Sequence, residues 1–245
     1  MTLSRRLTDD PAPTLSVFGR ALARRAVPAA VGLFLAGLAI GWVISGPVGL
    51  SLGEDRLSVL IQSGRTPGLD TLALTASAIG SVAGNAILCV VSVALVWVLT
   101  RRWWLSALPA VALTLHVVVH FTTSTLVARP RPEVERLDIG QPTASFPSGH
   151  VGATTAQLLV LVLVLFLRVK SGLWRTVVVA AVTGFLIVLG WSRVYLGMHH
   201  VTDVVWGAVN GVACGLIAWW FLRSRPPAEP AGGPASATSG PGALD

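Results

Sequence analysis

Residues 151–167 read VGATTAQLLVLVLVLFL, a run without an ionisable side chain that follows directly on Pro147-Ser148-Gly149-His150. An α-helix rises about 1.5 Å per residue, so roughly 17–25 apolar residues are needed to cross about 30 Å of hydrocarbon. The run is short for this purpose, but Ser, Gly and snorkelling Arg side chains at its ends can extend it. It therefore predicts a membrane-spanning helix with a polar sequence at its entrance.

Five further runs lack Asp, Glu, Lys and Arg, and they cover residues 26–53, 71–100, 103–128, 176–192 and 204–222. The run at 71–100 is long enough to be tilted, or to begin as an interfacial turn near Gly80 and Gly84. Only 12% of the 245 residues are charged and 53% are hydrophobic, which is too little charge for the surface of a soluble protein of this size. The sequence therefore predicts an all-α fold, a bundle of six transmembrane helices.

The basic residues predict how this bundle is oriented. Of the 18 Lys and Arg residues, 12 lie before residue 26, between the second and third runs, between the fourth and fifth, or after residue 222. Short cytoplasmic segments carry an excess of Lys and Arg. We therefore expect both termini to be cytoplasmic and the loops at 51–70, 129–150 and 193–203 to face outside.

This arrangement divides the chain into three parts. We expect a cytoplasmic N-terminal tail at 1–25, a six-span domain at 26–222, and a disordered cytoplasmic tail at 223–245, which is rich in Pro, Ala, Gly and Ser. The net charge of +7 is explained by membrane orientation, so it gives no reason to expect a nucleic-acid partner. The oligomeric state does not follow from the sequence.

The loop between the third and fourth runs carries the first polar cluster. It includes Arg131-Pro132 and ends in Ser148-Gly149-His150 at the mouth of the fourth span. Ser148 is a good helix N-cap, and Gly149 lets a ligand approach the backbone. The free N–H groups and the positive dipole end of the following helix favour an anion, and His150 lies in the first turn beside it.

The second polar cluster joins the fifth and sixth runs and contains Ser192, Arg193, His199 and Asp203. If this stretch is helical, His199 and Asp203 share a face, and the carboxylate can accept the Nδ1–H of the imidazole. Nε2 of His199 would then be free to act as a nucleophile. The planar guanidinium of Arg193 suits phosphate oxygens. The alternative for His199 and Asp203 is an ion pair that stabilises a helix start.

Together these residues resemble the type 2 phosphatidic acid phosphatase and vanadium haloperoxidase superfamily, in its integral-membrane lipid phosphatase branch. Its three motifs are K-x6-R-P, P-S-G-H and S-R-x5-H-x3-D. The second and third are complete here, as Pro147-Ser148-Gly149-His150 and as Ser192-Arg193, His199 and Asp203. The first keeps Arg131-Pro132, but Ser124 stands where the motif has Lys, and Thr122 stands at the same offset from Arg129. The resemblance spans about residues 26–222.

The resemblance implies a mechanism for these residues. His199 would attack phosphorus to form a phosphohistidine, Asp203 would orient it, and His150 would protonate the leaving oxygen and then activate water. The phosphate oxygens would be held by Arg131, Arg193, the Ser148 hydroxyl and the Gly149 N–H. Arg129 and Ser124 are further candidates for phosphate binding, because the motif Lys is missing. No metal and no other cofactor is required.

The implied protein is a multi-pass enzyme of the cell membrane with an extracytoplasmic site. It would hydrolyse a phosphate or pyrophosphate monoester of a lipid, such as undecaprenyl pyrophosphate or phosphatidic acid. A lipid phosphotransferase or a catalytically impaired lipid-phosphate-binding homologue would carry the same residues. A transporter is disfavoured, because the charges lie at span ends and no internal repeat is evident.

His116 and His120 lie four residues apart in the third run. Their spacing could ligate a metal ion. We favour the alternative that they form a polar inward face near the phosphate pocket.

Overall fold

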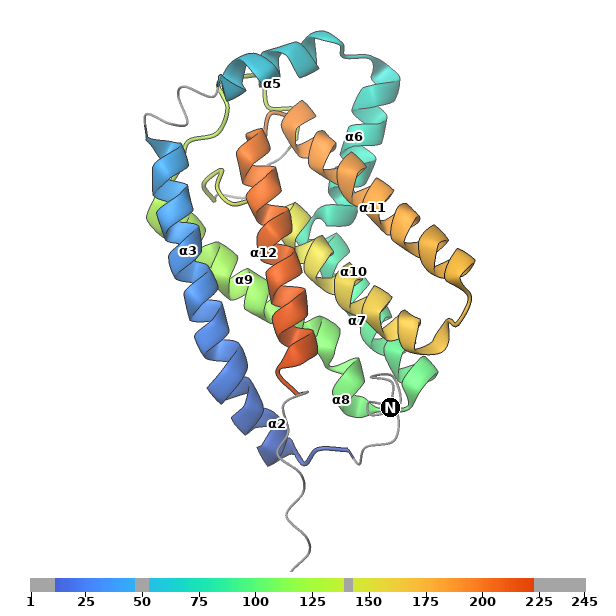
Figure 1. The fold of residues 1–245 in the computed structure, drawn as a ribbon. Coiled ribbons are helices and arrows are strands. Elements are labelled where there is room, and N and C mark those ends of the chain that lie inside the picture. Colours follow the sequence, from blue (N-terminus) through green and yellow to red (C-terminus); the bar gives the residue numbers. More distant parts are fainter. Residues whose placement is uncertain (1–11, 47–52, 139–142, 223–245) are drawn as a thin grey trace, which may run out of the picture.

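The computed structural model describes residues 12–46, 53–138 and 143–222, and within these ranges every regular element is a helix (Figure 1). The expected tail at 223–245 lies outside the described residues. Six helical segments are long and apolar enough to cross a membrane: Leu15–Ser45, Val82–Thr100, Trp103–Val127, Gly149–Arg168, Gly172–Tyr195 and Val201–Trp220. The predicted all-α bundle with six candidate transmembrane helices is therefore confirmed.

The first of these segments begins earlier than the run at 26–53 indicated. It joins α2 (Leu15–Ala21), a π-helical turn, η1 (Leu22–Ala26), and α3 (Val27–Ser45) into one rod. Residues 15–25, expected to belong to a tail, are helical because an apolar face packs on the bundle. The ring of Phe18 lies 5.3 Å from that of Trp103 and 5.2 Å from that of Phe221.

The run at 71–100 is divided at Ser81, close to the interfacial turn that Gly80 and Gly84 suggested. One helix, α6 (Pro67–Gly80), ends there, and α7 (Val82–Thr100) begins. Ser81 has an extended backbone, and its hydroxyl accepts the N–H of Gly84, which caps α7. A Cβ at Gly84 would lie 2.2 Å from the Ile79 carbonyl oxygen, so this sharp turn requires glycine. Only α7 remains as the spanning part.

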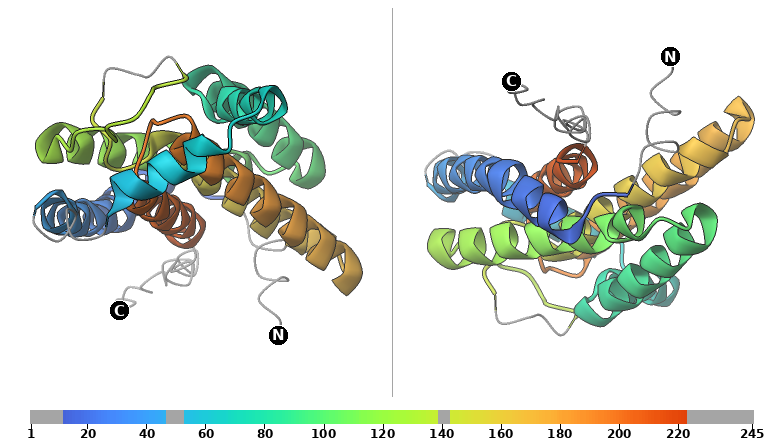
Figure 2. Two further views of the ribbon diagram at one scale, coloured as in Figure 1. Left: turned by 90° about the horizontal axis from the view of Figure 1, so that it is seen from above. Right: turned by 90° about the horizontal axis from the view of Figure 1, so that it is seen from below.

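A short amphipathic helix, α5 (Glu54–Ser63), precedes α6 and lies across one end of the bundle, at the top of Figure 1. Seen from above, it crosses the region where α11 (Gly172–Tyr195) ends and α12 (Val201–Trp220) begins (Figure 2). The other helices of the bundle are the short α8 (Trp103–Ser106), α9 (Leu108–Val127) and α10 (Gly149–Arg168). The two loops that carry the motif residues meet at the end covered by α5.

Close packing of α10 against α12 brings the two motif regions together. A Cβ on Gly207 would lie 2.6 Å from the Ser148 carbonyl oxygen, and one on Gly211 would lie 2.4 Å from that of Gly152. Small residues four apart let two helix backbones approach this closely. The N-terminus of α12 is therefore held beside the N-terminus of α10.

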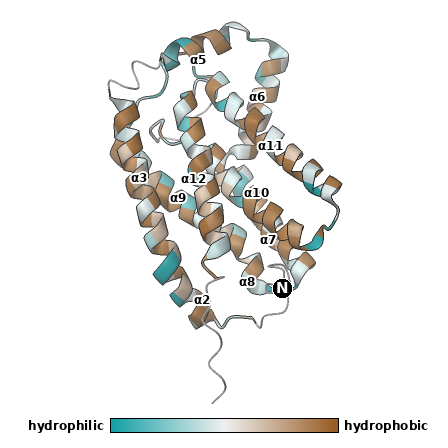
Figure 3. Ribbon diagram, viewed as in Figure 1, coloured by the Kyte–Doolittle hydropathy of each residue, from teal (hydrophilic) through white to brown (hydrophobic). Residues whose placement is uncertain are grey.

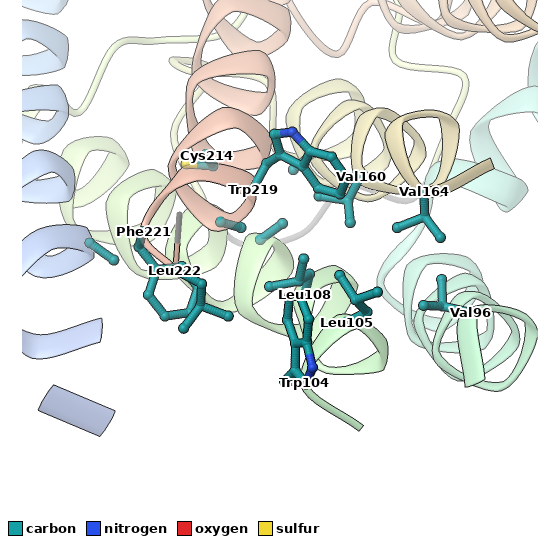
Figure 4. Packing of buried hydrophobic residues seen from close by; sticks show 14 residues of the cluster. Val96, Trp104, Leu105, Leu108, Val160, Val164, Cys214, Trp219, Phe221 and Leu222 are labelled. Atoms are coloured by element: carbon teal, nitrogen blue, oxygen red, sulfur yellow. The ribbon is translucent and has the colours of Figure 1, made fainter. Parts of the chain in front are cut away.

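At the opposite end of the bundle the helices pack through a cluster of buried apolar side chains, which Figure 4 shows. Its buried members include Trp104, Leu105, Leu108, Val160 and Phe221. Hydrophobic residues predominate along the long helices, as the colouring of Figure 3 shows. Many large apolar side chains lie on their outer surface, such as Val90 and Leu173, which are 70% and 73% exposed. Such faces are stable against lipid rather than water.

Candidate active site

A cavity of about 400 Å³ lies between α7, α9, the start of α10 and the segment that joins α11 to α12. The motif residues that line it are Arg131, Gly149, His150, Arg193 and His199. The remaining wall is largely apolar and comes from α7 and α9. The structure thus brings five of the sequence-predicted site residues to one cavity.

His199 is 4% exposed and precedes α12, which begins at Val201. The expected hydrogen bond to Asp203 depended on a helix that includes both residues, and this expectation is wrong. Nδ1 of His199 instead contacts the backbone carbonyl oxygen of Ser145 at 2.6 Å. A carbonyl can only accept, so Nδ1 carries the proton and the lone pair is on Nε2. Burial and the nearby Arg193 hold the pKa of His199 well below its usual range, which keeps the imidazole neutral.

Asp203 organises the surroundings of His199 rather than the imidazole itself. Its Oδ2 accepts the Ser145 hydroxyl at 2.5 Å and the His200 N–H at 2.8 Å, while Oδ1 accepts Nη1 of Arg129 at 2.5 Å. The Ser145 N–H donates to the Arg129 carbonyl oxygen at 2.9 Å. Ser145 is therefore fixed on both sides, and its own carbonyl is aimed at His199.

Arg129 is 5% exposed and is committed to carboxylates. Besides Asp203 it contacts Glu54 of α5, at 2.9 Å from Nη2 to Oε2. Burial lowers the pKa of Arg129, but Asp203 and Glu54 outweigh this effect, and the net pKa is raised. Glu54 also accepts the Thr202 N–H at 2.8 Å, so it caps α12 from outside. Arg129 thus links α5 to Asp203 through its two ion pairs. It does not line the cavity that the other motif residues line.

Arg193 reaches the same cavity from the last turn of α11. Its Nη1 donates to Asp138 at 2.7 Å and also contacts the hydroxyl of Ser77 on α6. Its Nε is buried without a hydrogen-bond partner. The contacts of Nη1 orient the guanidinium, and Nε retains an N–H that no protein group in the described ranges accepts.

Arg131 is held by backbone carbonyls of both motif loops. It donates from Nη1 to the Met198 carbonyl at 2.5 Å and from Nη2 to the Thr143 carbonyl at 3.1 Å. Burial and the neighbouring Arg193 lower the pKa of Arg131. Two guanidinium groups in one partly buried cavity repel each other, and a bound anion would relieve that repulsion.

The start of α10 provides Gly149 and His150, but Ser148 behaves differently from the expectation. Ser148 occupies the N-cap position without making a side-chain capping bond, and its hydroxyl is buried with no partner. Neither Ser148 nor Ser124 is among the residues that line the cavity, and the Ser124 hydroxyl is also buried without a partner. A Cβ at Gly149 would lie 2.9 Å from Nε2 of His120, so the His120 ring would have to shift if residue 149 carried a side chain.

His116 and His120 line the cavity from α9, as the interpretation of an inward polar face predicted. Their rings stack at 5.7 Å between centroids, and Nδ1 of His116 contacts the Asn210 amide at 3.3 Å. Among the residues that the structure describes, no three His, Cys, Asp or Glu side chains are grouped so that they could hold a metal ion.

Several residues of the site were missed by the sequence reasoning. Ser77, Asp138 and Glu54 each contact a motif residue from a distant part of the chain, and no local pattern marks them. Ser145 had a usable signal, because it stands directly before the Phe-Pro-Ser-Gly-His sequence, although its role depends on a backbone carbonyl.

A comparison of the chain with known protein families finds one that covers the residues of this site. The model of the PAP2 superfamily matches residues 103–227, which are 125 of the 245 residues and include all the residues that line the site from α9 to His199. This chain belongs to the PAP2 superfamily. It is a phosphatase, an enzyme that hydrolyses phosphoric ester bonds, because the family match is joined by solved PAP2 phosphatases with the same fold.

Two solved structures resemble this PAP2 protein. The first transmembrane PAP2-type phosphatidylglycerolphosphate phosphatase from Bacillus subtilis is 22% identical, with a TM-score of 0.69, over 82% of this chain and 98% of that one. LpxE from Aquifex aeolicus is 25% identical, with a TM-score of 0.53, over 67% of this chain and 93% of that one. The first likeness supports the fold.

Proposed function

We propose that this PAP2 protein removes a terminal phosphate from a membrane lipid phosphate or pyrophosphate at the outer leaflet. The observation that carries the proposal is that the cavity joins two kinds of wall. Arg131, His150, Arg193 and His199 form a polar end, whereas Val82 of α7 and Val117 and Phe121 of α9 form an apolar side. These three are 67%, 48% and 59% exposed on the outer, apolar surface of the bundle. A lipid tail can therefore lie along them while the head group reaches His199.

Nε2 of His199 attacks phosphorus, and the bond from phosphorus to the leaving oxygen breaks. His150 donates a proton to that oxygen, which leaves as the lipid alcohol or, from a pyrophosphate, as the lipid monophosphate. Water then attacks the phosphohistidine, His150 accepts a proton from this water, and the phosphorus–nitrogen bond breaks. Inorganic phosphate is released, and both imidazoles return to their starting states.

Arg131, Arg193 and the Gly149 N–H bind the phosphate oxygens throughout these steps. Their donors are already fixed by Met198, Asp138 and the helix start, so little reorganisation is needed as charge moves in the transition state. Ser148 remains a proposed fourth donor, because its hydroxyl is unpartnered directly before Gly149. The Ser145 carbonyl stabilises the positive charge that His199 acquires when it is phosphorylated.

The orientation follows from the distribution of Lys and Arg. With cytoplasmic termini, the end covered by α5 faces outside, and the substrate comes from the outer leaflet. Polyprenyl pyrophosphates such as undecaprenyl pyrophosphate, and phosphatidic acid, have the required combination of a terminal phosphate group and a long apolar tail. The Bacillus subtilis neighbour is named for a phosphatidylglycerol phosphate, which has the same combination.

Phosphate release by the purified protein in detergent micelles tests this proposal. Undecaprenyl pyrophosphate and phosphatidic acid are compared as substrates, with EDTA present and with orthovanadate as a phosphate mimic. We expect release from at least one lipid, inhibition by vanadate, and a loss of about 10³-fold or more in His199→Ala. Thr122→Ala is the matched control, because Thr122 is exposed on the outer face of α9. Absence of release by the wild type, or full release by His199→Ala, contradicts the proposal.

A further inference from the structure

Glu54, the first residue of α5, is buried although its helix lies across one end of the bundle. Its side chain is 7% exposed. Oε1 accepts the Thr202 N–H at 2.8 Å, and Oε2 accepts both the Thr202 hydroxyl and Nη2 of Arg129 at 2.9 Å. A carboxylate is costly to bury unless such contacts compensate its charge. No step of the proposed phosphoryl transfer uses this buried carboxylate.

A short series of contacts joins Glu54 to the nucleophile. Arg129 lies between two carboxylates, with Nη2 at 2.9 Å from Glu54 and Nη1 at 2.5 Å from Asp203. Asp203 accepts the hydroxyl of Ser145, whose carbonyl accepts the Nδ1–H of His199. Glu54, Arg129 and Asp203 are all buried, so solvent screens their charges little. The charge of Glu54 therefore influences His199 through Arg129 and Asp203.

The buried ion pairs leave one negative charge uncompensated, because Glu54 and Asp203 share the single guanidinium of Arg129. The neighbouring His200 does not balance this charge. Its ring accepts the Asp203 N–H in a capping box, and an imidazole that accepts a hydrogen bond is neutral. Without Glu54, the charge of Arg129 would be matched by Asp203 alone. Glu54 therefore leaves Asp203 with negative charge that can act on its surroundings.

That negative charge is needed when Nε2 of His199 forms a bond. A neutral imidazole becomes positively charged when it attacks phosphorus. Burial and Arg193 lower the pKa of His199, and Arg131 adds to this effect, whereas Asp203 acts in the opposite direction. The negative charge of Asp203 thus stabilises the transition state and the phosphohistidine more than it stabilises the free imidazole.

We propose that Glu54 is a positioning residue that sets the reactivity of His199, because it shares Arg129 with Asp203 and so leaves negative charge on Asp203 for the imidazole that is being phosphorylated. This inference rests on the proposed function, since it concerns the nucleophile of the same site. It predicts that Glu54 affects ligands that bond to Nε2 more than ligands that only occupy the phosphate site.

Orthovanadate and inorganic phosphate distinguish these two kinds of ligand. Vanadium readily accepts a fifth ligand and can bond to Nε2 of His199, whereas inorganic phosphate binds through its oxygens alone. In His199→Asn vanadate should therefore lose its advantage over phosphate. A preference for vanadate that persists in His199→Asn would overturn the role of Glu54, since the preference would not depend on the nucleophile.

Glu54→Gln removes the charge and keeps the length of the side chain. We expect vanadate binding to weaken by about 10-fold, within the range for groups coupled through one ion-pair network, and phosphate binding to stay within about twofold of the wild type. The kcat for the lipid should fall by a similar factor at an unchanged KM. An equal loss of affinity for both anions, or no loss for either, would overturn the proposal.

Glu135→Gln is the matched control. Glu135 pairs with Arg65 at 2.8 Å, much as Glu54 pairs with Arg129, but its side chain is 70% exposed. An exposed ion pair contributes little, so both anion affinities and kcat should match the wild type. A loss of vanadate affinity in Glu135→Gln as large as that in Glu54→Gln would overturn the specific role of Glu54.

A double variant, Glu54→Gln with Arg129→Gln, separates charge from contact geometry. It removes one negative and one positive charge, so the charge of Asp203 is again uncompensated. We expect the ratio of vanadate to phosphate affinity to return to within about threefold of the wild type, although more contacts are lost than in Glu54→Gln. A further decrease in this ratio would overturn the proposal. The double variant is compared directly with the wild type if Glu54→Gln does not fold.

Anion binding is measured by the thermal stabilisation of the protein in detergent, which does not require turnover. A wild type that binds vanadate more tightly than phosphate but releases no phosphate from lipids would overturn the proposed function. The comparison of the Glu54 variants would remain valid in that case. Vanadate affinity that is equal in the wild type and Glu54→Gln would overturn only the role of Glu54.

Discussion

At the scale of single residues, the orientation of His199 depends on a backbone carbonyl. Ser145 supplies this carbonyl, and its hydroxyl is anchored to Asp203 at 2.5 Å. Asp203 therefore acts on His199 through Ser145 as well as through its negative charge. This arrangement makes Ser145 a positioning residue that does not touch the substrate.

We predict that Ser145→Ala lowers kcat by about 10-fold and leaves KM nearly unchanged, because a looser carbonyl orients Nε2 of His199 less well. Initial-rate measurements on the lipid substrate check this. Ser63→Ala, at an exposed hydroxyl on α5, is the control. A wild-type kcat in Ser145→Ala would show that Asp203 does not act through this residue.

Because His199 binds a proton less strongly in the folded state than in the unfolded state, the free energy of unfolding depends on pH through this residue. In the folded state burial and Arg193 lower the pKa of His199, whereas in the unfolded chain it has its usual value of about 6.5. Below about pH 6.5 the unfolded state therefore binds the proton more strongly, and stability falls by up to about 1.4 kcal/mol per pH unit from this group. Ligand-free wild type should lose more thermal stability between pH 7 and pH 5 than His199→Asn does. Parallel curves for the two proteins would contradict this.

At the scale of elements, the close approach of α10 and α12 sets the distance between the motifs. The sequence predicted the two helices but not this contact. Gly152, Gly207 and Gly211 are far apart in the chain, and their role in close packing is evident only once the helices lie side by side. The same limit applies to Asp203. Its spacing from His199 suggested a shared helical face, but α12 starts between them.

A substitution at the contact between α10 and α12 tests its importance. In Gly211→Ala the new Cβ would lie 2.4 Å from the Gly152 carbonyl oxygen, so the helices must separate. We expect a destabilisation of about 1–3 kcal/mol, seen as a lower Tm in detergent, together with reduced activity. Gly184→Ala on α11 has no atom within 4 Å of its Cβ and should match or exceed the wild-type Tm. Equal Tm values for the two variants would contradict the contact.

At the scale of the whole molecule, the charge-free runs predicted the six candidate spans, and the motifs predicted five of the residues that line one cavity. The contacts made by Glu54, Ser77 and Asp138 could not be predicted, since they join segments far apart in the chain. The first helical segment begins at Leu15, before the charge-free run does, and charge alone does not reveal that Phe18 packs on Trp103 and Phe221. Local charge therefore predicts the number of candidate spans better than it predicts helix ends.

The proposed orientation is tested by labelling single cysteines from outside the cell. In a chain without Cys89 and Cys214, an impermeant maleimide should react with Glu133→Cys, near the α5 end, and not with Gly172→Cys at the start of α11. Both positions are exposed. After permeabilisation both should react. The reverse pattern in intact cells would place the site on the cytoplasmic side.

The central claim is that the phosphoryl group passes through Nε2 of His199. Rapid acid-free quenching of the enzyme with a ³²P-labelled lipid pyrophosphate or phosphatidic acid, followed by peptide mapping, measures it most directly. We predict an acid-labile, alkali-stable label on the peptide that contains His199, with none in His199→Asn. With the pyrophosphate the label should accumulate in His150→Gln, because lipid monophosphate can leave without a proton from His150 whereas water is no longer activated. Two results would contradict the account. One is turnover by the wild type with no labelled histidine in the wild type or in His150→Gln. The other is a label retained in His199→Asn.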